Sequence, residues 1–196
     1  MDFTKTYTLE DERILLRPLN LEDTNLLIPY ALHEPNTWKY SVTALVGATG
    51  MQEYVQEALK QKENQSSYPF IVFDKLTNQY IGSTRLYDIQ LFHKTAQLGY
   101  TWYSEASRGT GINKHCKYLL LQFAFETLGF ERVEFRADLR NELSIAAMKS
   151  IGCTVEGVLR KSLLLSDGDR RDSIVLSILK SEWESGIKTS LRERLK

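Results

Sequence analysis

The stretch WYSEASRGTGIN, residues 102–113, carries the end of an expected strand, a loop with two glycines and the start of the clearest helix in the chain. Unpaired backbone N–H groups at a helix start, together with the helix dipole, favour an anion such as phosphate. Gly109 and Gly111 let a ligand reach the main chain, and Arg108 adds a charged donor. The stretch therefore predicts either a phosphate-binding loop or only a tight turn, because a short glycine motif is a weak signal.

Two common phosphate-binding motifs do not fit this loop. The chain contains no G-x-x-x-x-G-K-[ST] pattern, which excludes a nucleotide triphosphatase loop by pattern. The dinucleotide-binding fingerprint G-x-G-x-x-G also fails, because Lys114 stands where its third glycine belongs. The loop is therefore of another type.

Before this stretch, hydrophobic periodicity predicts two helices between a first strand and three further strands. The expected strands are 13–17, 68–74, 80–88 and 96–103, and the expected helices are 21–33 and 51–62. Thr77 and Asn78 supply turn chemistry between the second and third strands, so these two form an expected antiparallel hairpin.

After the loop, the chain reads as helix, strand, helix and two strands. The expected helices are 112–128, with Gly129 as its C-terminal cap, and 141–151. The expected strands are 132–138, 154–165 and 170–179, the last two joined by a turn at 166–169. Residues 183–196 read as a polar tail of frayed helix. The whole pattern predicts one mixed α/β (α+β) domain over 1–196, with about seven strands in a largely antiparallel sheet flanked by helices.

Composition excludes several classes of function. The 25 basic and 25 acidic side chains give zero formal net charge, so nothing demands nucleic acid or an acidic membrane as a partner. The three histidines and two cysteines share no metal-ligand or disulfide spacing, and we expect no metal. The N-terminus lacks a secretory pattern, and no apolar run approaches the roughly 20 residues needed to cross a bilayer. We expect a cytoplasmic protein.

The strand, the sequence RGTGIN at 108–113 and the long amphipathic helix after it together resemble the acetyl-CoA signature [QR]-x-x-G-x-[GA] of the GNAT superfamily of acetyltransferases. Further motifs resemble the branch that contains the ribosomal-protein N-terminal acetyltransferases. They are LRPL at 16–19, NELS at 141–144, IGC at 151–153, EGVLR at 156–160, RDS at 171–173 and SEW at 181–183. Several spaced motifs in the family's order are more specific than one loop. Asn113 departs from the signature, which has glycine or alanine there.

The resemblance implies a set of residues that bind acetyl-CoA. Main-chain groups of the loop would cradle its pyrophosphate, the end of the preceding strand would hydrogen-bond its pantetheine arm, and the N-x-x-[SA] motif would lie beside it. These residues are Arg108, Gly109, Thr110, Gly111, Ile112 and Asn113 in the loop, Thr101, Trp102 and Tyr103 in the strand, and Asn141 and Ser144 in the motif. From the residues alone, Asn141 is simply the start of a helix.

The resemblance also implies the reaction, which is direct attack of an amine on the acetyl group within a ternary complex. Many relatives carry a tyrosine that protonates the leaving thiolate, but Met148 stands at the corresponding position and cannot donate a proton. Ser144 is the nearest alternative donor. For the base we expect either Glu134 or a chain of water molecules, although an exposed strand glutamate is more often only solvated.

Two classes of function remain open on the sequence. The first is an N-acetyltransferase that acts on a peptide N-terminus or on a small-molecule amine, as a monomer or a homodimer. The second is a non-catalytic module that binds acyl-CoA without turnover, which the missing tyrosine keeps open. The sequence does not identify the acceptor amine, because the segments that would border it carry the fewest motifs.

Overall fold

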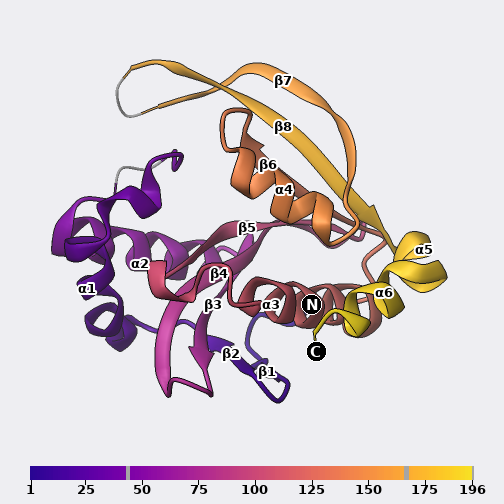
Figure 1. The fold of residues 1–196 in the computed structure, drawn as a ribbon, viewed down its shortest axis with the longest axis horizontal. Helices are drawn as coiled ribbons and strands as arrows, with labels where there is room; N and C mark the ends of the chain where they lie inside the picture. Colours follow the sequence, from indigo (N-terminus) through magenta and orange to yellow (C-terminus); the bar gives the residue numbers. More distant parts are fainter. Residues whose placement is uncertain (43–44, 166–167, 196) are drawn as a thin grey trace.

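The computed structural model describes residues 1–42, 45–165 and 168–195 of the chain. Its centre is one eight-stranded sheet in the order β1-β2-β3-β4-β5-β6-β8-β7 (Figure 1). The strands are β1 Leu9–Glu10, β2 Ile14–Pro18, β3 Ser67–Asp74, β4 Gln79–Gln90, β5 Thr95–Tyr103, β6 Arg132–Asp138, β7 Thr154–Leu164 and β8 Arg170–Leu179. All neighbouring strands are antiparallel except β5 and β6, which are parallel.

Helices lie in the connections that the sequence predicted for them, and two short helices follow the last strand. They are α1 Thr24–His33, α2 Gly47–Glu63, α3 Ile112–Gln122, α4 Glu142–Ser150, α5 Lys180–Glu182 and α6 Lys188–Glu193. The chain also contains short 3₁₀ helices at Leu21–Asp23, Pro35–Trp38 and Glu105–Ser107. Single turns of π helix lie at Phe123–Thr127 and Trp183–Ile187. None of the helices in the described ranges is both long enough and apolar enough to span a membrane.

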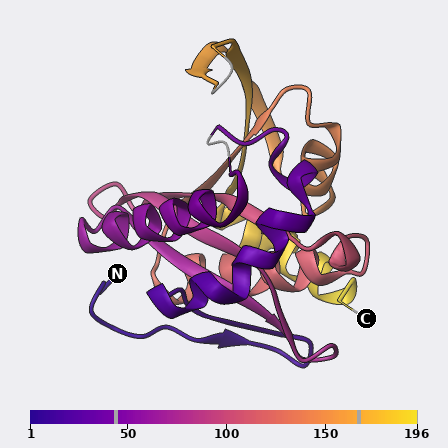
Figure 2. The same cartoon turned by 90° about the vertical axis from the view of Figure 1, so that its left-hand side faces the viewer.

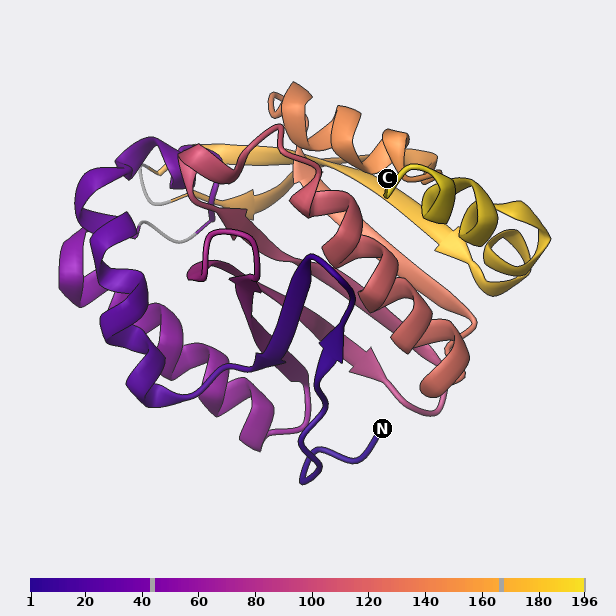
Figure 3. The same cartoon turned by 60° about the horizontal axis from the view of Figure 1, so that its bottom comes forward.

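Helices cover both faces of the central part of the sheet (Figures 2 and 3), whereas the edge strand β7 is exposed along nearly its whole length. On one face, α1 and α2 pack through Leu27, Met51 and Val55 against Ile71 and Trp102 of the sheet. On the other face, α3, α4 and the C-terminal helices share a larger apolar core with the opposite side chains of the strands. The period-2 alternation of the strands and the period-3.6 alternation of the helices produce these two cores.

The helix that follows the glycine loop is the central element of the larger core. Cys116, Leu120 and Ala124 are fully buried along it. Its last turn widens to a π turn at Phe123–Thr127, and Gly129, with φ of 68°, ends it as the sequence predicted. The helix therefore crosses from the end of β5 to the start of β6 and makes the one parallel pair possible.

The expected mixed, largely antiparallel sheet is confirmed with one strand more, and one expectation is corrected by the structure. The sheet has eight strands because residues 9–10, too short to show a period, pair with β2. The expected frayed tail is wrong, since Trp183 and Leu191 are fully buried. Trp183 donates its indole N–H to Glu126 at 2.8 Å, and Lys188 pairs with the same carboxylate, so the last helices pack onto α3.

The other expectations for the last segments stand as follows. The predicted hairpin of the last two strands is present, while Ser166 and Asp167 of its expected turn lie outside the described residues. A single domain over 1–196 stays a prediction.

Gly82 allows β4 and β5 to approach closely, and its replacement tests that contact. A Cβ at this position would overlap the carbonyl oxygen of Trp102 on β5. We expect Gly82→Ala to lower the free energy of unfolding by about 1–3 kcal/mol, because the two strands must separate to accommodate it. Urea unfolding measures the change. Gln79→Ala, at the exposed start of the same strand, should stay within about 0.5 kcal/mol of the parent, and equal effects of the two variants would contradict the contact.

Candidate functional site: a wedge between two parallel strands

Strands β5 and β6 pair over three residues and then separate. The parallel pairs are Thr95 with Arg132, Ala96 with Val133 and Gln97 with Glu134. Beyond them, residues 98–103 of β5 have no partner on β6 anywhere in the described chain. Backbone N–H and C=O groups on this side of β5 are therefore left without a strand partner, and the two strands form the sides of a wedge.

A bulge in β5 accompanies the separation. The register between β4 and β5 shifts next to Tyr100, whose φ of 49° is unfavourable for a residue other than glycine. The Arg85 guanidinium lies 4.0 Å from the centroid of the Tyr100 ring, and the Tyr87 ring packs edge-on at 5.0 Å. Tyr54 donates its hydroxyl to the Tyr100 carbonyl at 3.3 Å. These contacts from two elements, β4 and α2, stabilise the strained residue and thereby the wedge.

The open end of the wedge lies beside the starts of two helices. The two strands are parallel, so their carboxyl ends lie on the same side of the sheet. The chain after β5 runs through the glycine loop into α3, and the chain after β6 runs directly into α4. The sequence motifs at 108–113 and 141–144, which lie about 30 residues apart, therefore both border the wedge.

The glycine loop presents unpaired donors. Gly109 and Gly111 adopt φ of 76° and 90°, a conformation that side chains disfavour, and an added Cβ at either would meet no atom within 4 Å. Gly111 is the N-cap of α3 and makes no side-chain cap. Among the described residues, the backbone N–H groups of 109–113 donate to no protein acceptor. Such an arrangement at a helix start binds anions.

The side chains of the loop are directed to the protein. Arg108 donates to Thr37 Oγ1 at 2.6 Å and so links the loop to the turn after α1. Thr110 donates its hydroxyl to the Ser107 carbonyl, and Ile112 is buried in the core. A role for the Arg108 guanidinium at a phosphate stays a prediction and requires exchange of its bond to Thr37.

Asn113, the departure from the family signature, contacts another predicted ligand residue. Its Oδ1 accepts a hydrogen bond of 3.3 Å from the hydroxyl of Tyr103. Burial raises the pKa of that phenol, which therefore remains a donor at neutral pH. Trp102, by contrast, turns its ring toward Trp38 on the α1–α2 face, with ring centroids 5.3 Å apart, so only its main chain faces the wedge.

The N-x-x-[SA] motif forms the start of α4. Asn141 is its N-cap and accepts the backbone N–H of Ser144 at 3.1 Å, which is the local role that the residues alone predicted. The Ser144 side chain is half-buried, and its hydroxyl has no hydrogen-bond partner among the described residues. Met148, one turn further along α4, belongs to the apolar core.

Glu134, a predicted base, stands opposite Gln97 at the narrow end of the wedge. Both of its carboxylate oxygens are ion-paired, one to Arg132 at 2.8 Å and one to Arg136 at 2.7 Å. Removing a proton from an amine would break one of these pairs. The role of Glu134 as the base stays a prediction. Its two ion pairs favour the other predicted base, a chain of water molecules.

Sequence reasoning missed Lys117. This side chain is only 5% exposed, and its ammonium donates to Thr101 Oγ1 at 2.8 Å. Helical spacing could have revealed this burial. Lys117 stands three, four and seven residues before Leu120, Leu121 and Ala124, which are all buried. This spacing places the lysine on the face of the helix that packs against the core.

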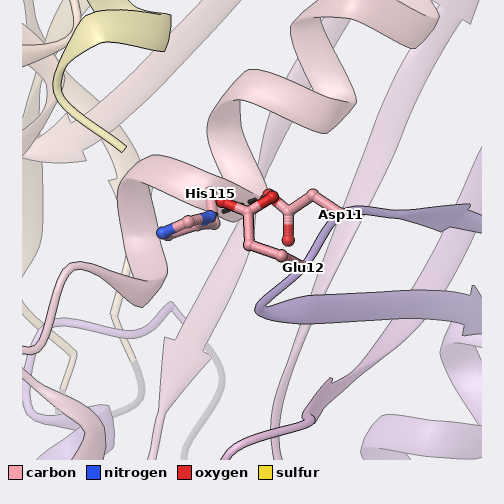
Figure 4. Close-up of side chains that lie close together, drawn as sticks. All are labelled: Asp11, Glu12 and His115. Carbon is pink, nitrogen blue, oxygen red and sulfur yellow. Dashed lines mark hydrogen bonds and ion pairs between the residues drawn. The ribbon is translucent and has the colours of Figure 1, made fainter. Parts of the chain in front are cut away.

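One further cluster of potential ligands lies outside the wedge. Asp11 and Glu12, from the turn between β1 and β2, approach His115 of α3, and one ligand atom of each lies within 4.8 Å of the others (Figure 4). Asp11 accepts the backbone N–H groups of Arg13 and Ile14 and lies 2.7 Å from His115 Nδ1. Through these bonds, Asp11 links the turn between β1 and β2 to α3, which gives the cluster a structural role.

Comparison with known proteins identifies the family. The family model described as the acetyltransferase (GNAT) domain matches residues 13–154. A relative named as the uncharacterized N-acetyltransferase p20 of Bacillus licheniformis is 26% identical over 177 residues, which cover 90% of this chain and 98% of p20. YdaF of Bacillus subtilis, a candidate ribosomal N-acetyltransferase, is 34% identical over 103 residues, 53% of this chain and 55% of YdaF. The chain therefore belongs to the GNAT family and is an N-acetyltransferase.

Solved structures share the fold. A candidate acetyltransferase from T. thermophilus superimposes with a TM-score of 0.86 at 32% identity, over 96% of this chain and 97% of its own. The microcin C7 self-immunity acetyltransferase MccE, solved with acetyl-CoA and AMP, gives a TM-score of 0.77 over 86% of this chain and 93% of its own. At 20% identity, the likeness to MccE shows the fold alone.

The cap of α4 gives a prediction for this site. Asn141→Ala removes the acceptor for the Ser144 N–H, so we expect a loss of about 1 kcal/mol in the free energy of unfolding. Asn141→Asp keeps a side-chain oxygen and should lose less than half as much. Urea unfolding of both variants measures the difference, and equal losses would show that the cap does not stabilise the helix.

Proposed function

We propose that this protein transfers the acetyl group of acetyl-CoA to a primary amine by direct attack in a ternary complex. The observation that carries the proposal is the separation of β5 and β6 beside a glycine loop with unpaired backbone N–H groups. GNAT acetyltransferases use acetyl-CoA, and MccE was solved with that molecule bound. The wedge and the glycine loop of this chain support the same co-substrate.

The residues at the wedge fit the chemical parts of acetyl-CoA. The N–H groups of 109–113 suit a pyrophosphate, and the unpaired edge of β5 at 101–103 suits the amides of a pantetheine arm added like a strand. Asn113 fits as well, since its amide is held by Tyr103. These residues would place the thioester between the two strands.

Acetyl-CoA supplies an activated acyl carbon, and the protein supplies position and protons. The amine must reach the carbon with its lone pair free, and the departing thiolate needs a proton. Ser144, with its hydroxyl unpartnered among the described residues at the start of α4, stays a candidate both for contact with the co-substrate and for donation of this proton. For the amine, we propose that its proton passes to water, because Glu134 is held in two ion pairs.

For the acceptor amine, we propose two classes and no single molecule. YdaF carries a name that refers to ribosomal acetylation, which supports a peptide N-terminus as one acceptor, and a small-molecule amine is the other. The family assignment favours turnover over the alternative of an acyl-CoA-binding module, which Met148 in place of the tyrosine had left open on the sequence. Turnover decides between these functions.

A charge in the glycine loop tests the binding site. We expect Gly111→Asp to weaken acetyl-CoA binding at least about tenfold, or about 1.4 kcal/mol, because a carboxylate would face the phosphates. Gly129→Asp is the matched control, since Gly129 also has a positive φ and open space but lies at the far end of the helix segment. Calorimetric titration with acetyl-CoA measures both affinities. Retained affinity in Gly111→Asp would reject the loop as the binding site.

Release of free coenzyme A thiol tests the reaction. The purified protein is given acetyl-CoA with ribosomal-protein N-terminal peptides, polyamines or amino acids, against an amine-free blank. We expect release above the blank for one acceptor class. If no acceptor gives thiol release above the blank while acetyl-CoA still raises the melting temperature of the protein, the result would favour the binding module.

A further inference from the structure

A buried lysine lies between the diverging strands, and the residues described above give it no structural task. The Nζ of Lys117 is 2.8 Å from Thr101 Oγ1 on β5 and 5.7 Å from the centroid of the Phe135 ring on β6. Thr101 belongs to the unpaired part of β5, and Phe135 is the first residue of β6 beyond the last parallel pair. The ammonium therefore lies beside one side chain from each of the two separating strands, on the face of the sheet that α3 covers.

The surroundings of Lys117 provide no counter-charge. The titratable groups that act on it are the thiols of Cys116 on the same helix and Cys153 after α4, and burial raises the pKa of each to about 12, so both stay neutral. No carboxylate pairs with Lys117 in the described part of the chain. Burial lowers the pKa of its ammonium to about 8.

A purely structural lysine does not fit these observations. A charge in an apolar layer destabilises the fold unless it is paired, and a methionine or leucine would pack there without that cost. The single bond to Thr101 is shared, since Thr101 Oγ1 also lies 2.7 Å from Thr84 Oγ1. A residue that lowers stability at a binding site is expected where function requires it.

We propose that Lys117 is the catalytic acid that protonates the leaving thiolate, a role that rests on the proposed function. In this step the amine nitrogen forms a bond to the acetyl carbon, and the carbon–sulfur bond breaks with its electron pair on sulfur. The Lys117 ammonium gives its proton to that sulfur. The proton lost by the amine nitrogen passes to water, from which the lysine is recharged.

The chemistry of the group suits this task. An ammonium with a pKa of about 8 is close in acidity to an ordinary thiol, at about 8.5, so proton transfer between them is nearly balanced. Desolvation disfavours the ammonium before the reaction, and negative charge on sulfur favours it as the bond breaks. The stabilisation is therefore larger in the transition state than in the resting protein. Lys117 would thus protonate the leaving thiolate, which Met148, at the position of the family's tyrosine, cannot do.

The first experiment measures the pKa of the coenzyme A thiol in the bound state and does not depend on turnover. Coenzyme A bound to the wild type should show a thiol pKa at least about one unit below that in Lys117→Met, because an ammonium nearby favours the thiolate. Ultraviolet absorbance of the thiolate, followed against pH, gives both values. Equal thiol pKa values with coenzyme A bound to both proteins would overturn the role of Lys117 and leave the proposed function intact. Failure of coenzyme A to bind the wild type would overturn both.

The second experiment measures the rate with the acceptor that turns over. Lys117→Met should lower kcat by about 10²–10⁴-fold with a KM for acetyl-CoA within a few-fold of wild type. The wild-type kcat should fall as the pH rises above about 8, and the residual activity of the variant should lack that fall. Lys149→Met, the same change at an exposed site of α4, is the control and should keep full activity. A kcat within threefold of wild type in Lys117→Met would overturn the proposal.

The third experiment shows that the loss of rate is not a loss of fold. The lysine pKa is about 8 in the folded protein against an ordinary 10.5, so the unfolded chain binds more protons between these values. The destabilisation is therefore complete below pH 8 and disappears toward pH 10.5. Lys117→Met should melt at a higher temperature than wild type at pH 7, with the difference shrinking over that window. A variant that melts lower at pH 7 would assign Lys117 a structural role instead.

Discussion

The short parallel pairing between β5 and β6 is the constraint on which the rest of the molecule depends. Three residue pairs join the strands, and then β5 bends at Tyr100 while β6 continues along β8. Continued pairing would satisfy the backbone of both strands and leave no edge for a ligand. The separation also places the ends of β5 and β6, and with them the starts of α3 and α4, around one opening. The proposed binding site therefore depends on an interruption of the sheet.

Residues that lower stability gather at this interruption. Tyr100 has a positive φ. Within the described residues, the fully buried Arg85 has an Nε without a hydrogen-bond partner, and the buried charge of Lys117 has no carboxylate partner. Each would be unfavourable in an ordinary sheet. The apolar cores on the two faces offset these costs, because α2 and α3 hold the strands from opposite sides. Local strain of this kind is typical of a site kept for binding and chemistry.

Much of the fold could be predicted from the sequence because its signals are local. The alternation at 132–138 predicted β6 to the residue, and the helix after the glycine loop was predicted with its glycine cap. The tail is helical as expected, but the expected fraying was wrong, since Trp183 packs on the helix around Glu126, which is distant in sequence. The two-residue strand β1 was missed because a period needs more residues than it has.

By itself the sequence determined the types and order of the elements, the glycine loop at a helix start and the family that these motifs resemble. Only the tertiary structure decided that β5 and β6 separate, that Glu134 is held by two arginines and that Lys117 reaches Thr101. The physical reason is the range of the interactions. Backbone propensity and periodicity act between near neighbours in the chain, whereas strand pairing, ion pairing and desolvation depend on residues that only folding brings together.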